Sequence, residues 1–208
     1  GGGLELKAFA EAEPGWRFDG VDPAPEMLKL AKTTLGSLAS RVRLHEGYVD
    51  VAPQGPFDAA VCLLTLHFVP AGERLRTLLE VHRRLKPDAP FVMAHLSFPQ
   101  GAERERWLSR YAAFAVSSGI EPARAESGRA AIAAQLPILS PEEDERILME
   151  AGFSNVSLFY AGLAFRGWVA FAEEVTTTWV DDPSVDEAAL LALLRDSLTR
   201  LAELAFAG

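Results

Sequence analysis

The sequence predicts an α/β fold with a mostly parallel sheet and an antiparallel strand pair near its C-terminal end. Short apolar runs alternate with helical patterns along most of the 208 residues, which is typical of βαβ units. An aspartate, Asp22, closes the first apolar run, as expected at a strand end that faces a ligand. The last two apolar runs follow each other directly and predict the antiparallel pair.

The first half of the chain predicts an ordered series of helices and strands. A helix over Leu4 to Ala12 ends at Pro14-Gly15, where the backbone cannot continue the helical ladder. The following elements are a strand over 16–21, a helix over 25–36, strands over 42–45 and 57–64, a helix over 73–85 and a strand over 91–96.

The second half is richer in helices. Ser140 and Glu143 form the sequence pattern of a capping box, so we expect a helix from there to Gly152. The other expected elements are helices over 104–118 and 129–136, strands over 156–160 and 165–172, and a long helix over 184–206. We therefore expect a main domain over 1–172 with a helical lid insertion at about 100–136, and a helical extension over 173–208.

Composition restricts the function classes. The net charge is −9 and no stretch is dense in lysine or arginine, so nucleic acid is a disfavoured partner and a small molecule is the default. No apolar run reaches the length of a membrane span. A single cysteine, Cys62, suits a reducing compartment, and we expect the cytoplasm. Four scattered histidines predict no metal site.

The chain begins with three glycines, Gly1 to Gly3, which are candidates for a ligand-binding turn. Glycine lets the backbone approach a ligand because no Cβ stands in the way. Asp22 follows Gly3 by 19 positions, a spacing that suits an acidic residue binding the ribose of an adenosine-type cofactor. The dinucleotide pattern fails because Leu6 stands where its last glycine belongs, and no lysine follows for a Walker phosphate loop.

The remaining pattern resembles the class I S-adenosylmethionine-dependent methyltransferases over residues 1–172. The motifs that carry the resemblance, in family order, are Gly1-Gly2-Gly3-Leu4, Gly20-Val21-Asp22-Pro23, Pro25 to Leu28, Phe57 to Val61, Leu64 to Val69, Leu85-Lys86-Pro87 and Ala151-Gly152-Phe153. This resemblance implies a doubly wound, Rossmann-like sheet. It also implies that the first strand, and a helix before it, precede Gly1 in the natural protein.

The resemblance implies S-adenosyl-L-methionine as cofactor and a set of residues that bind it. The glycine turn would contact the methionine part, Asp22 the ribose hydroxyls, and the loop at Gly47 the adenine edge. In full, the implied cofactor residues are Gly1, Gly3, Asp22, Pro23, Met27, Gly47, Tyr48, Val49, Leu63 and Leu64. Tyr48 occupies a slot that is often acidic in the family, so Asp50 or backbone groups would bind the exocyclic amine; an ordinary turn role for Asp50 is equally open.

The expected substrate residues lie at the end of the strand over 91–96 and in the helices that follow it. They are His95, Trp107, Tyr111 and Arg129, with core packing as the alternative for the aromatic residues. His67 is expected to be structural. Residues 114–167 are also similar to carboxy-S-adenosylmethionine synthase and its relatives, in which an arginine holds the extra carboxylate; Arg129 would take that role, with a surface salt bridge as the alternative.

The predicted function is transfer of a methyl group to a small-molecule acceptor by in-line displacement. The pattern identifies no catalytic residue, because an already nucleophilic acceptor requires no acid or base. Two alternatives stay open: a carboxy-S-adenosylmethionine synthase-like enzyme, and a methyltransferase-fold protein that binds without catalysis. Leucines repeat three and four residues apart over 190–204, so this helix buries an apolar face on its own domain or in a homodimer.

Overall fold

A computed structural model describes residues 2–172, which form two compact units, residues 2–54 and 55–172. The first unit contains α1 (Leu4–Ala12), β1 (Phe18–Asp22), α2 (Pro25–Leu35) and β2 (Val42–Glu46), with 3-10 turns η1 (Gly36–Arg41) and η2 (Val49–Val51).

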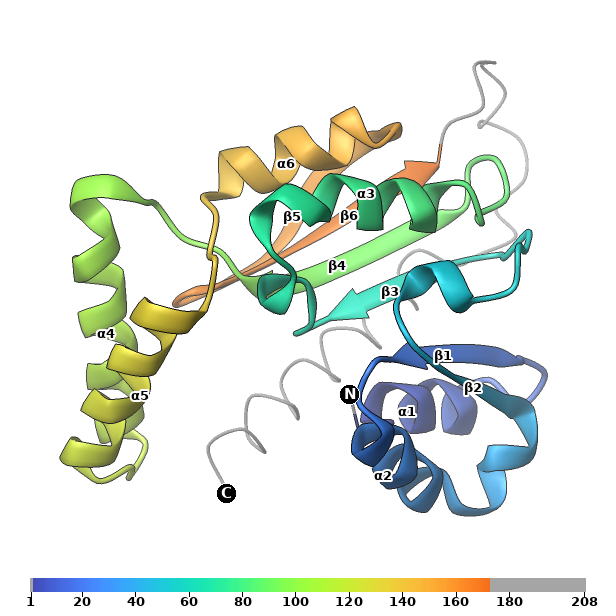
Figure 1. Cartoon of the computed structure of the whole chain (residues 1–208), viewed down its shortest axis with the longest axis horizontal. Helices are drawn as coiled ribbons and strands as arrows, with labels where there is room; N and C mark the ends of the chain where they lie inside the picture. Colours follow the sequence, from blue (N-terminus) through green and yellow to red (C-terminus); the bar gives the residue numbers. More distant parts are fainter. Residues whose placement is uncertain (1, 173–208) are drawn as a thin grey trace. The chain divides into compact units, whose positions relative to one another are not determined.

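The second unit contains β3 (Ala60–Leu63), η3 (Leu66–Phe68), α3 (Ala71–His82), β4 (Pro90–Leu96), η4 (Gly101–Glu103), α4 (Arg104–Ser117), α5 (Pro122–Gln135), α6 (Pro141–Glu150), β5 (Phe153–Gly162) and β6 (Phe165–Ala172). Figure 1 shows these elements.

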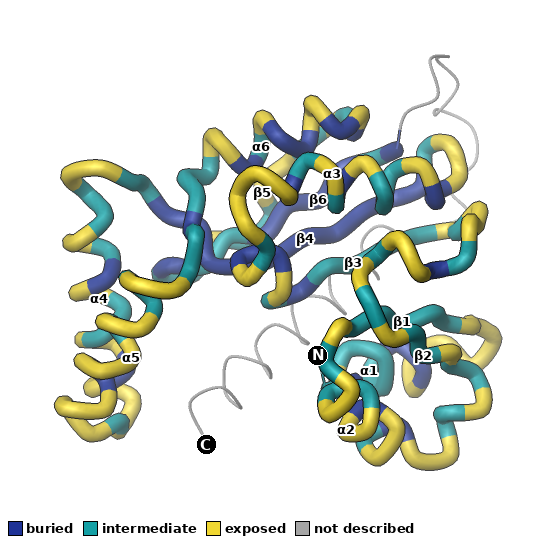
Figure 2. The backbone as a smooth tube through the Cα atoms, viewed as in Figure 1, coloured by how far each residue is buried: buried dark blue, intermediate teal, exposed yellow. Residues whose placement is uncertain are grey.

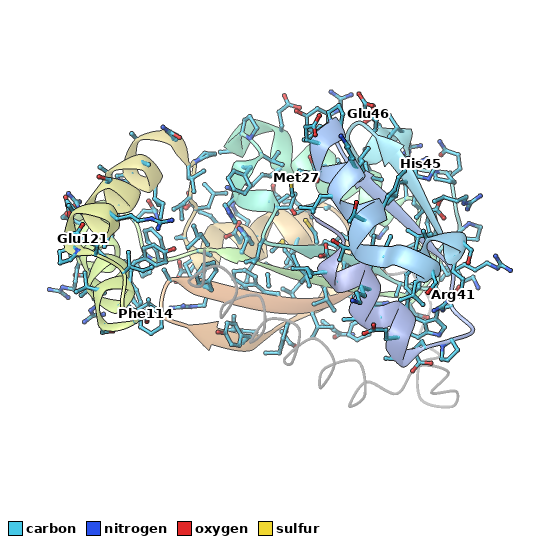
Figure 3. The ribbon with its side chains drawn as sticks, turned by 90° about the horizontal axis from the view of Figure 1, so that it is seen from below. Met27, Arg41, His45, Glu46, Phe114 and Glu121 are labelled. Atoms are coloured by element: carbon cyan, nitrogen blue, oxygen red, sulfur yellow. The ribbon has the colours of Figure 1, made fainter. Side chains whose placement is uncertain are left out.

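The first unit is a parallel strand pair with two helices. β1 and β2 run in register from Phe18 beside Val42 to Asp22 beside Glu46, and α2 makes the crossover that parallel strands require. The side chain of Arg41 holds the end of α1, because its Nη1 donates to the carbonyl oxygens of Glu13, Pro14 and Trp16 at 3.0, 3.1 and 3.3 Å (Figure 3).

The second unit is a four-stranded sheet in the order β3-β4-β6-β5. β3 and β4 are parallel and are joined through α3, whereas β4, β6 and β5 are antiparallel neighbours. Every residue of β4 is buried (Figure 2), consistent with its central place in the sheet. α3 and α6 pack over one face, with Leu78, Leu148 and Trp168 in the shared core.

The helices between β4 and β5 form a separate cluster. α4 and α5 pack against each other, and their apolar contacts include Leu108, Ile132 and Phe165. The start of α6 carries the predicted capping box: Ser140 Oγ accepts from the backbone N–H of Glu143 at 3.3 Å, and Glu143 Oε2 accepts from that of Ser140 at 2.9 Å.

The predicted fold class is confirmed: parallel pairs β1-β2 and β3-β4, and an antiparallel C-terminal pair β5-β6. The predicted helix over 184–206 lies outside the described residues. In the part of the chain that the structure describes, we find no helix with the length and apolar character needed to traverse a bilayer.

Candidate functional site

Asp22 ends β1 and begins the turn into α2. Its Oδ1 accepts the backbone N–H of Ala24 at 2.8 Å, which fixes the carboxylate at the N-terminal end of the helix. Its carbonyl oxygen accepts the N–H of Gly47 at 3.2 Å. Because Asp22 lies beside Glu46 in the strand register, two carboxylates stand at the same edge of the sheet. Asp22 is half-buried at this strand end.

The glycine turn lies against α2, close to this strand end. A Cβ built on Gly2 would approach Leu30 Cδ2 to 2.8 Å and Met27 Cε to 3.8 Å. The backbone N–H of Met27 in turn donates to the carbonyl oxygen of Ala24, the residue held by Asp22. The turn, Met27 (labelled in Figure 3) and Asp22 are therefore linked through the first turn of α2.

Gly3 has a structural reason to be glycine. It caps α1 with a φ of +81°, and a Cβ there would lie 2.9 Å from the Cα and Cβ of Ala31. Both the left-handed backbone and the close approach of α2 exclude a side chain. Gly1 lies outside the described residues, so the structure places only the end of the predicted glycine turn.

The loop after β2 presents the residues expected at an adenine edge. Gly47 has a φ of +140°, and Val51 stands 2.8 Å from where its Cβ would be. Tyr48 is 67% exposed and is thus free to lie along a flat ligand. Pro23 and Asp50 are exposed and Val49 is half-buried. The structure brings this loop to the end of β1 through the Gly47–Asp22 hydrogen bond.

Leu63 and Leu64 form the end of β3 in the second unit. Leu64 adopts a φ of +55°, a strained conformation for a non-glycine residue that occurs preferentially at functional sites. Its N–H donates to the carbonyl oxygen of Ala94 at 2.6 Å. The carbonyl oxygen of Leu63 accepts a hydrogen bond from the hydroxyl of Thr65 at 3.0 Å.

His95 is fully buried on β4, within a network of polar side chains. Its Nε2 lies 3.5 Å from Asp144 Oδ2, and Asp144 Oδ1 lies 3.1 Å from Nη1 of the buried Arg74. Burial, followed by the charge of Arg74, lowers the pKa of His95 well below its ordinary value. Burial raises the pKa of Asp144 to about 6, against the opposing hydrogen bond of Ser97 and charge of Arg74.

His67 lies beside this network. Its ring is nearly parallel to that of His95, with centroids 6.1 Å apart, and its Nδ1 accepts the backbone N–H of Leu96 at 3.4 Å. Burial, and then Arg74, lower the pKa of His67 to about 4, so the ring is neutral at pH 7. These contacts agree with a structural histidine, and contact of His95 with substrate stays a prediction.

The remaining predicted substrate residues belong to α4 and α5. Trp107 and Tyr111 are half-buried beside Phe165, and the rings of Tyr111 and Phe165 lie 6.3 Å apart. Arg129 donates to Glu126 at 2.6–3.0 Å and to Glu105 at 2.6 Å. That arrangement matches the surface salt bridge expected as the alternative for Arg129, and its carboxylate-binding role stays a prediction.

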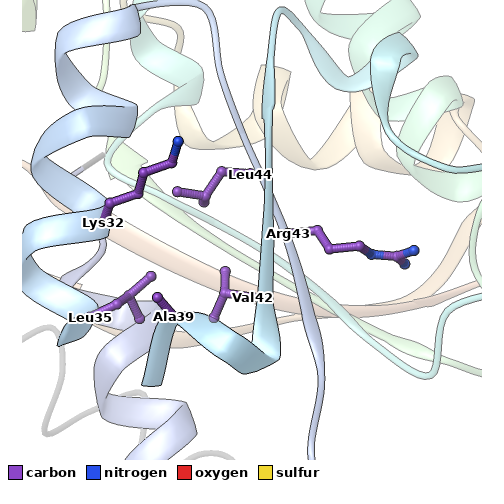
Figure 4. Close-up of a pocket in the computed structure, with 6 residues that line it drawn as sticks. All are labelled: Lys32, Leu35, Ala39, Val42, Arg43 and Leu44. Atoms are coloured by element: carbon purple, nitrogen blue, oxygen red, sulfur yellow. The ribbon is translucent and has the colours of Figure 1, made fainter. Parts of the chain in front are cut away.

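The structure reveals contacts that the sequence pattern did not indicate. The pairing of Glu46 with Asp22 follows from strand register, and the contact between Arg74 and Asp144 joins residues 70 positions apart. Among residues 2–172, no group of histidine, cysteine, aspartate and glutamate side chains has the arrangement of a metal site. Figure 4 shows the residues that line a pocket at the C-terminal end of α2, and none of the predicted site residues is among them.

Comparison with known proteins shows similarity to enzymes that use S-adenosylmethionine. A family described as a methyltransferase domain matches residues 1–91. The carboxy-S-adenosyl-L-methionine synthase of Chromohalobacter salexigens is 27% identical over 157 residues, which cover 74% of this chain and 58% of that protein. The chain thus spans less than two thirds of the length of this relative.

Solved methyltransferase structures share the fold. The S-adenosylmethionine-dependent methyltransferase SibL aligns with a TM-score of 0.60 at 18% identity, over 84% of this chain and 49% of that one. PigF with SAH aligns with a TM-score of 0.55 at 19% identity, over 80% and 46%. The chain thus has the fold of S-adenosylmethionine-dependent methyltransferases, and its first 91 residues are similar to a methyltransferase domain.

Proposed function

We propose that the protein transfers a methyl group from S-adenosyl-L-methionine to a small-molecule acceptor. The observation that carries this proposal is the end of β1, where the half-buried Asp22 is fixed by Ala24 and lies beside the Gly47 loop. A carboxylate held in this way suits the two hydroxyls of a ribose. The match of residues 1–91 to a methyltransferase domain supports the same ligand.

The residues present would hold the cofactor at defined points. Asp22 would accept the ribose hydroxyls, and the glycine turn would contact the methionine part. Met27 would lie along the sugar and adenine, and the exposed Tyr48 would lie along the adenine. The carbonyl oxygens of Leu63 and Leu64 would accept the amino group. S-adenosylmethionine supplies an activated methyl group when it is bound.

The protein would accelerate the reaction mainly by alignment and exclusion of water. Holding two reactants in line is worth up to about 7–11 kcal/mol of the barrier. An acceptor that is already nucleophilic requires no general base, and the half-buried aromatic rings of Trp107 and Tyr111 would exclude water from it.

Calorimetry with S-adenosylhomocysteine tests the cofactor site. We expect micromolar binding to the wild type and a loss of about tenfold or more in Asp22→Asn, because the amide keeps the bond from Ala24 but loses the charge that strengthens bonds from ribose hydroxyls. Glu26→Gln, an exposed change in the first turn of α2, is the matched control. Equal affinity in Asp22→Asn and the wild type would contradict the site.

A carboxy-S-adenosylmethionine synthase-like activity is the second candidate, and it is favoured by the similarity to the synthase of Chromohalobacter salexigens. Mass spectrometry of the reaction separates the candidates. A methylated acceptor with S-adenosylhomocysteine supports methyl transfer, and a carboxylated cofactor supports the alternative. Binding of S-adenosylhomocysteine without either product supports a methyltransferase-fold protein that does not catalyse.

Two further features of the proposal rest on sequence. We place the protein in the cytoplasm because it has a single cysteine, and we propose that the apolar face of residues 184–208 packs on its own domain or in a homodimer. Size-exclusion chromatography with and without residues 184–208 tests the second point. Loss of a dimer on truncation supports the homodimer, and an unchanged monomer supports packing on the same chain.

A further inference from the structure

We propose that Arg110 and Arg166 form an anion site at the ring of Trp107, which binds the carboxylate of a small aromatic acid. This inference rests on the proposed function in one respect, namely that the bound acid is the methyl acceptor. The site itself is defined by residues of the second unit alone.

The guanidinium groups of Arg110 and Arg166 both lie near the indole ring of Trp107. The Cζ atom of Arg110 lies 5.2 Å from the centroid of the Trp107 ring, and that of Arg166 lies 5.3 Å from it. Arg110 is one helical turn beyond Trp107 on α4, whereas Arg166 comes from β6. The face of an aromatic ring attracts cations, so the indole holds both charges in place without neutralising either.

Arg166 is oriented by the backbone. Its Nη1 donates to the carbonyl oxygens of Leu163 and Phe165, both at 2.8 Å, which fixes the plane of its guanidinium group. The other nitrogen atoms, Nη2 and Nε, are able to donate to a carboxylate in the forked geometry that arginine favours.

Neither arginine has a carboxylate partner among residues 2–172. The acidic side chains of the neighbouring helices are engaged elsewhere. Glu103 pairs with Arg106 at 2.9 Å, Glu105 and Glu126 pair with Arg129, and Glu121 caps α5 by accepting the backbone N–H of Arg124 at 3.1 Å. Two like charges that lie near one ring, with no carboxylate partner in the described part of the chain, favour the binding of an anion.

The site is placed where ligands bind in open α/β sheets. Arg166 lies beside His95 in the β4–β6 register, one residue before the carboxyl end of β4. Ligands of such sheets bind beyond the carboxyl ends of the parallel strands. Figure 1 shows α4 following β4 at this end, with the start of β6 beside it.

The surroundings select a flat ligand. Trp107 and Arg166 are half-buried and Arg110 is exposed, so the site is open to solvent on one side. Tyr111 and Phe165 contribute further aromatic surface, and burial raises the pKa of Tyr111, which keeps its hydroxyl protonated. A small aromatic acid would place its ring on this aromatic surface and its carboxylate at the guanidinium groups, so it matches both the apolar surface and the positive charge.

Binding of benzoate to the full chain tests the site, with the neutral benzamide as the matched probe. The readout is the indole N–H signal of Trp107 in an NMR titration, identified from its loss in Trp107→Phe. We expect benzoate to shift this signal saturably and benzamide to leave it in place. Arg110→Gln alters an exposed residue, and Arg166→Lys keeps the charge but removes the paired N–H donors of the guanidinium group. Each variant should bind benzoate about tenfold more weakly than the wild type.

Arg106→Gln is the control, because it removes the same charge from α4 at an exposed residue that pairs with Glu103. It should leave benzoate binding unchanged. Equal binding of benzamide, or unaltered benzoate binding in both Arg110→Gln and Arg166→Lys, would overturn the proposal. Inorganic phosphate that displaces benzoate at equal concentration would overturn the assignment to carboxylates.

The same samples separate this inference from the proposed function. S-adenosylhomocysteine should bind Arg110→Gln as tightly as the wild type. If the wild type binds benzoate through the arginines but does not bind S-adenosylhomocysteine, the methyl-transfer proposal fails and the anion site stands. If the wild type binds S-adenosylhomocysteine, and benzoate affinity is unchanged in Arg110→Gln and Arg166→Lys, only the anion site fails.

Discussion

At the residue scale, the buried ion pair of Arg74 and Asp144 places a strong constraint on the second unit. Both side chains are at most 1% exposed, and Arg74 Nε also donates to the carbonyl oxygen of Val69 at 3.3 Å. Removing one partner of a buried pair leaves an uncompensated charge, which is far more costly than the pair itself was favourable.

Arg74→Met should therefore destabilise the protein by about 3–5 kcal/mol, because it leaves the Asp144 carboxylate buried without its cation. Arg76→Met on the same helix is the control. Arg76 is 74% exposed in its side chain and pairs with Glu73 at only 3.9 Å, so its loss should change stability by less than about 0.5 kcal/mol. Urea unfolding measures both variants, and equal effects would contradict the argument.

His67 should contribute to acid sensitivity. The native state lowers its pKa from 6.5 to about 4, so the fold favours the neutral ring. This contribution to stability is complete above pH 6.5 and is lost as the pH falls towards 4. Between about pH 7.5 and 5.5 the loss should be about 1 kcal/mol, and His67→Gln should remove it. Urea unfolding at the two pH values measures this, and parallel profiles would count against the prediction.

The residue scale also shows where sequence reasoning ends. Asp22 is predicted as a ribose-binding residue from its spacing of 19 positions after Gly3, because local strand and turn chemistry sets that spacing. The neighbours Arg74, His95 and Asp144 come from α3, β4 and α6, and no local pattern joins them. Only the three-dimensional packing of the helices on β4 brings them together.

At the element scale, local sequence signals predict the boundaries of some helices and strands correctly and miss others. α1 covers Leu4–Ala12 as predicted, because Pro14-Gly15 ends it. α5 was predicted from residue 129 but begins at Pro122, because Glu121 is a helix cap of a type that sequence patterns seldom indicate. β3 is shorter than the predicted 57–64: Phe57 forms only an isolated bridge with Leu85, and Asp58 is exposed.

The packing of α1 on α2 yields a prediction about Gly3. Gly3→Ala would place a methyl group 2.9 Å from the backbone of Ala31 and force alanine into a φ of +81°. The two effects should cost about 2–4 kcal/mol in the free energy of unfolding. Gly15→Ala is the control, because its φ is not positive and nothing lies within 4 Å of the added atom. Similar unfolding midpoints for the two variants would contradict the close approach.

At the scale of the whole molecule, the alternation of elements along the chain was enough to predict the fold class. The two sheets, β1-β2 and β3-β4-β6-β5, both contain the parallel pair that alternating helices and strands require. The acceptor could not be predicted in the same way. A methyltransferase fold accommodates many acceptors, and the anion site proposed above combines Trp107 and Arg110 of α4 with Arg166 of β6, which no local sequence pattern joins.

Ligand binding at the cofactor site should raise the stability of the whole protein. A ligand that binds only the native state at a hundredfold excess over its Kd adds about 2.7 kcal/mol to the free energy of unfolding. For a chain of 208 residues we expect S-adenosylhomocysteine to raise the Tm by about 5–10 °C. Asp22→Asn should show a clearly smaller rise at the same ligand concentration, because about a tenfold weaker site loses about 1.4 kcal/mol of this stabilisation. Differential scanning fluorimetry provides the measurement, with adenosine and S-adenosylmethionine as parallel ligands. A wild-type Tm that does not respond to S-adenosylhomocysteine would count against cofactor binding, and an equal rise in Asp22→Asn would show that the ligand is held elsewhere.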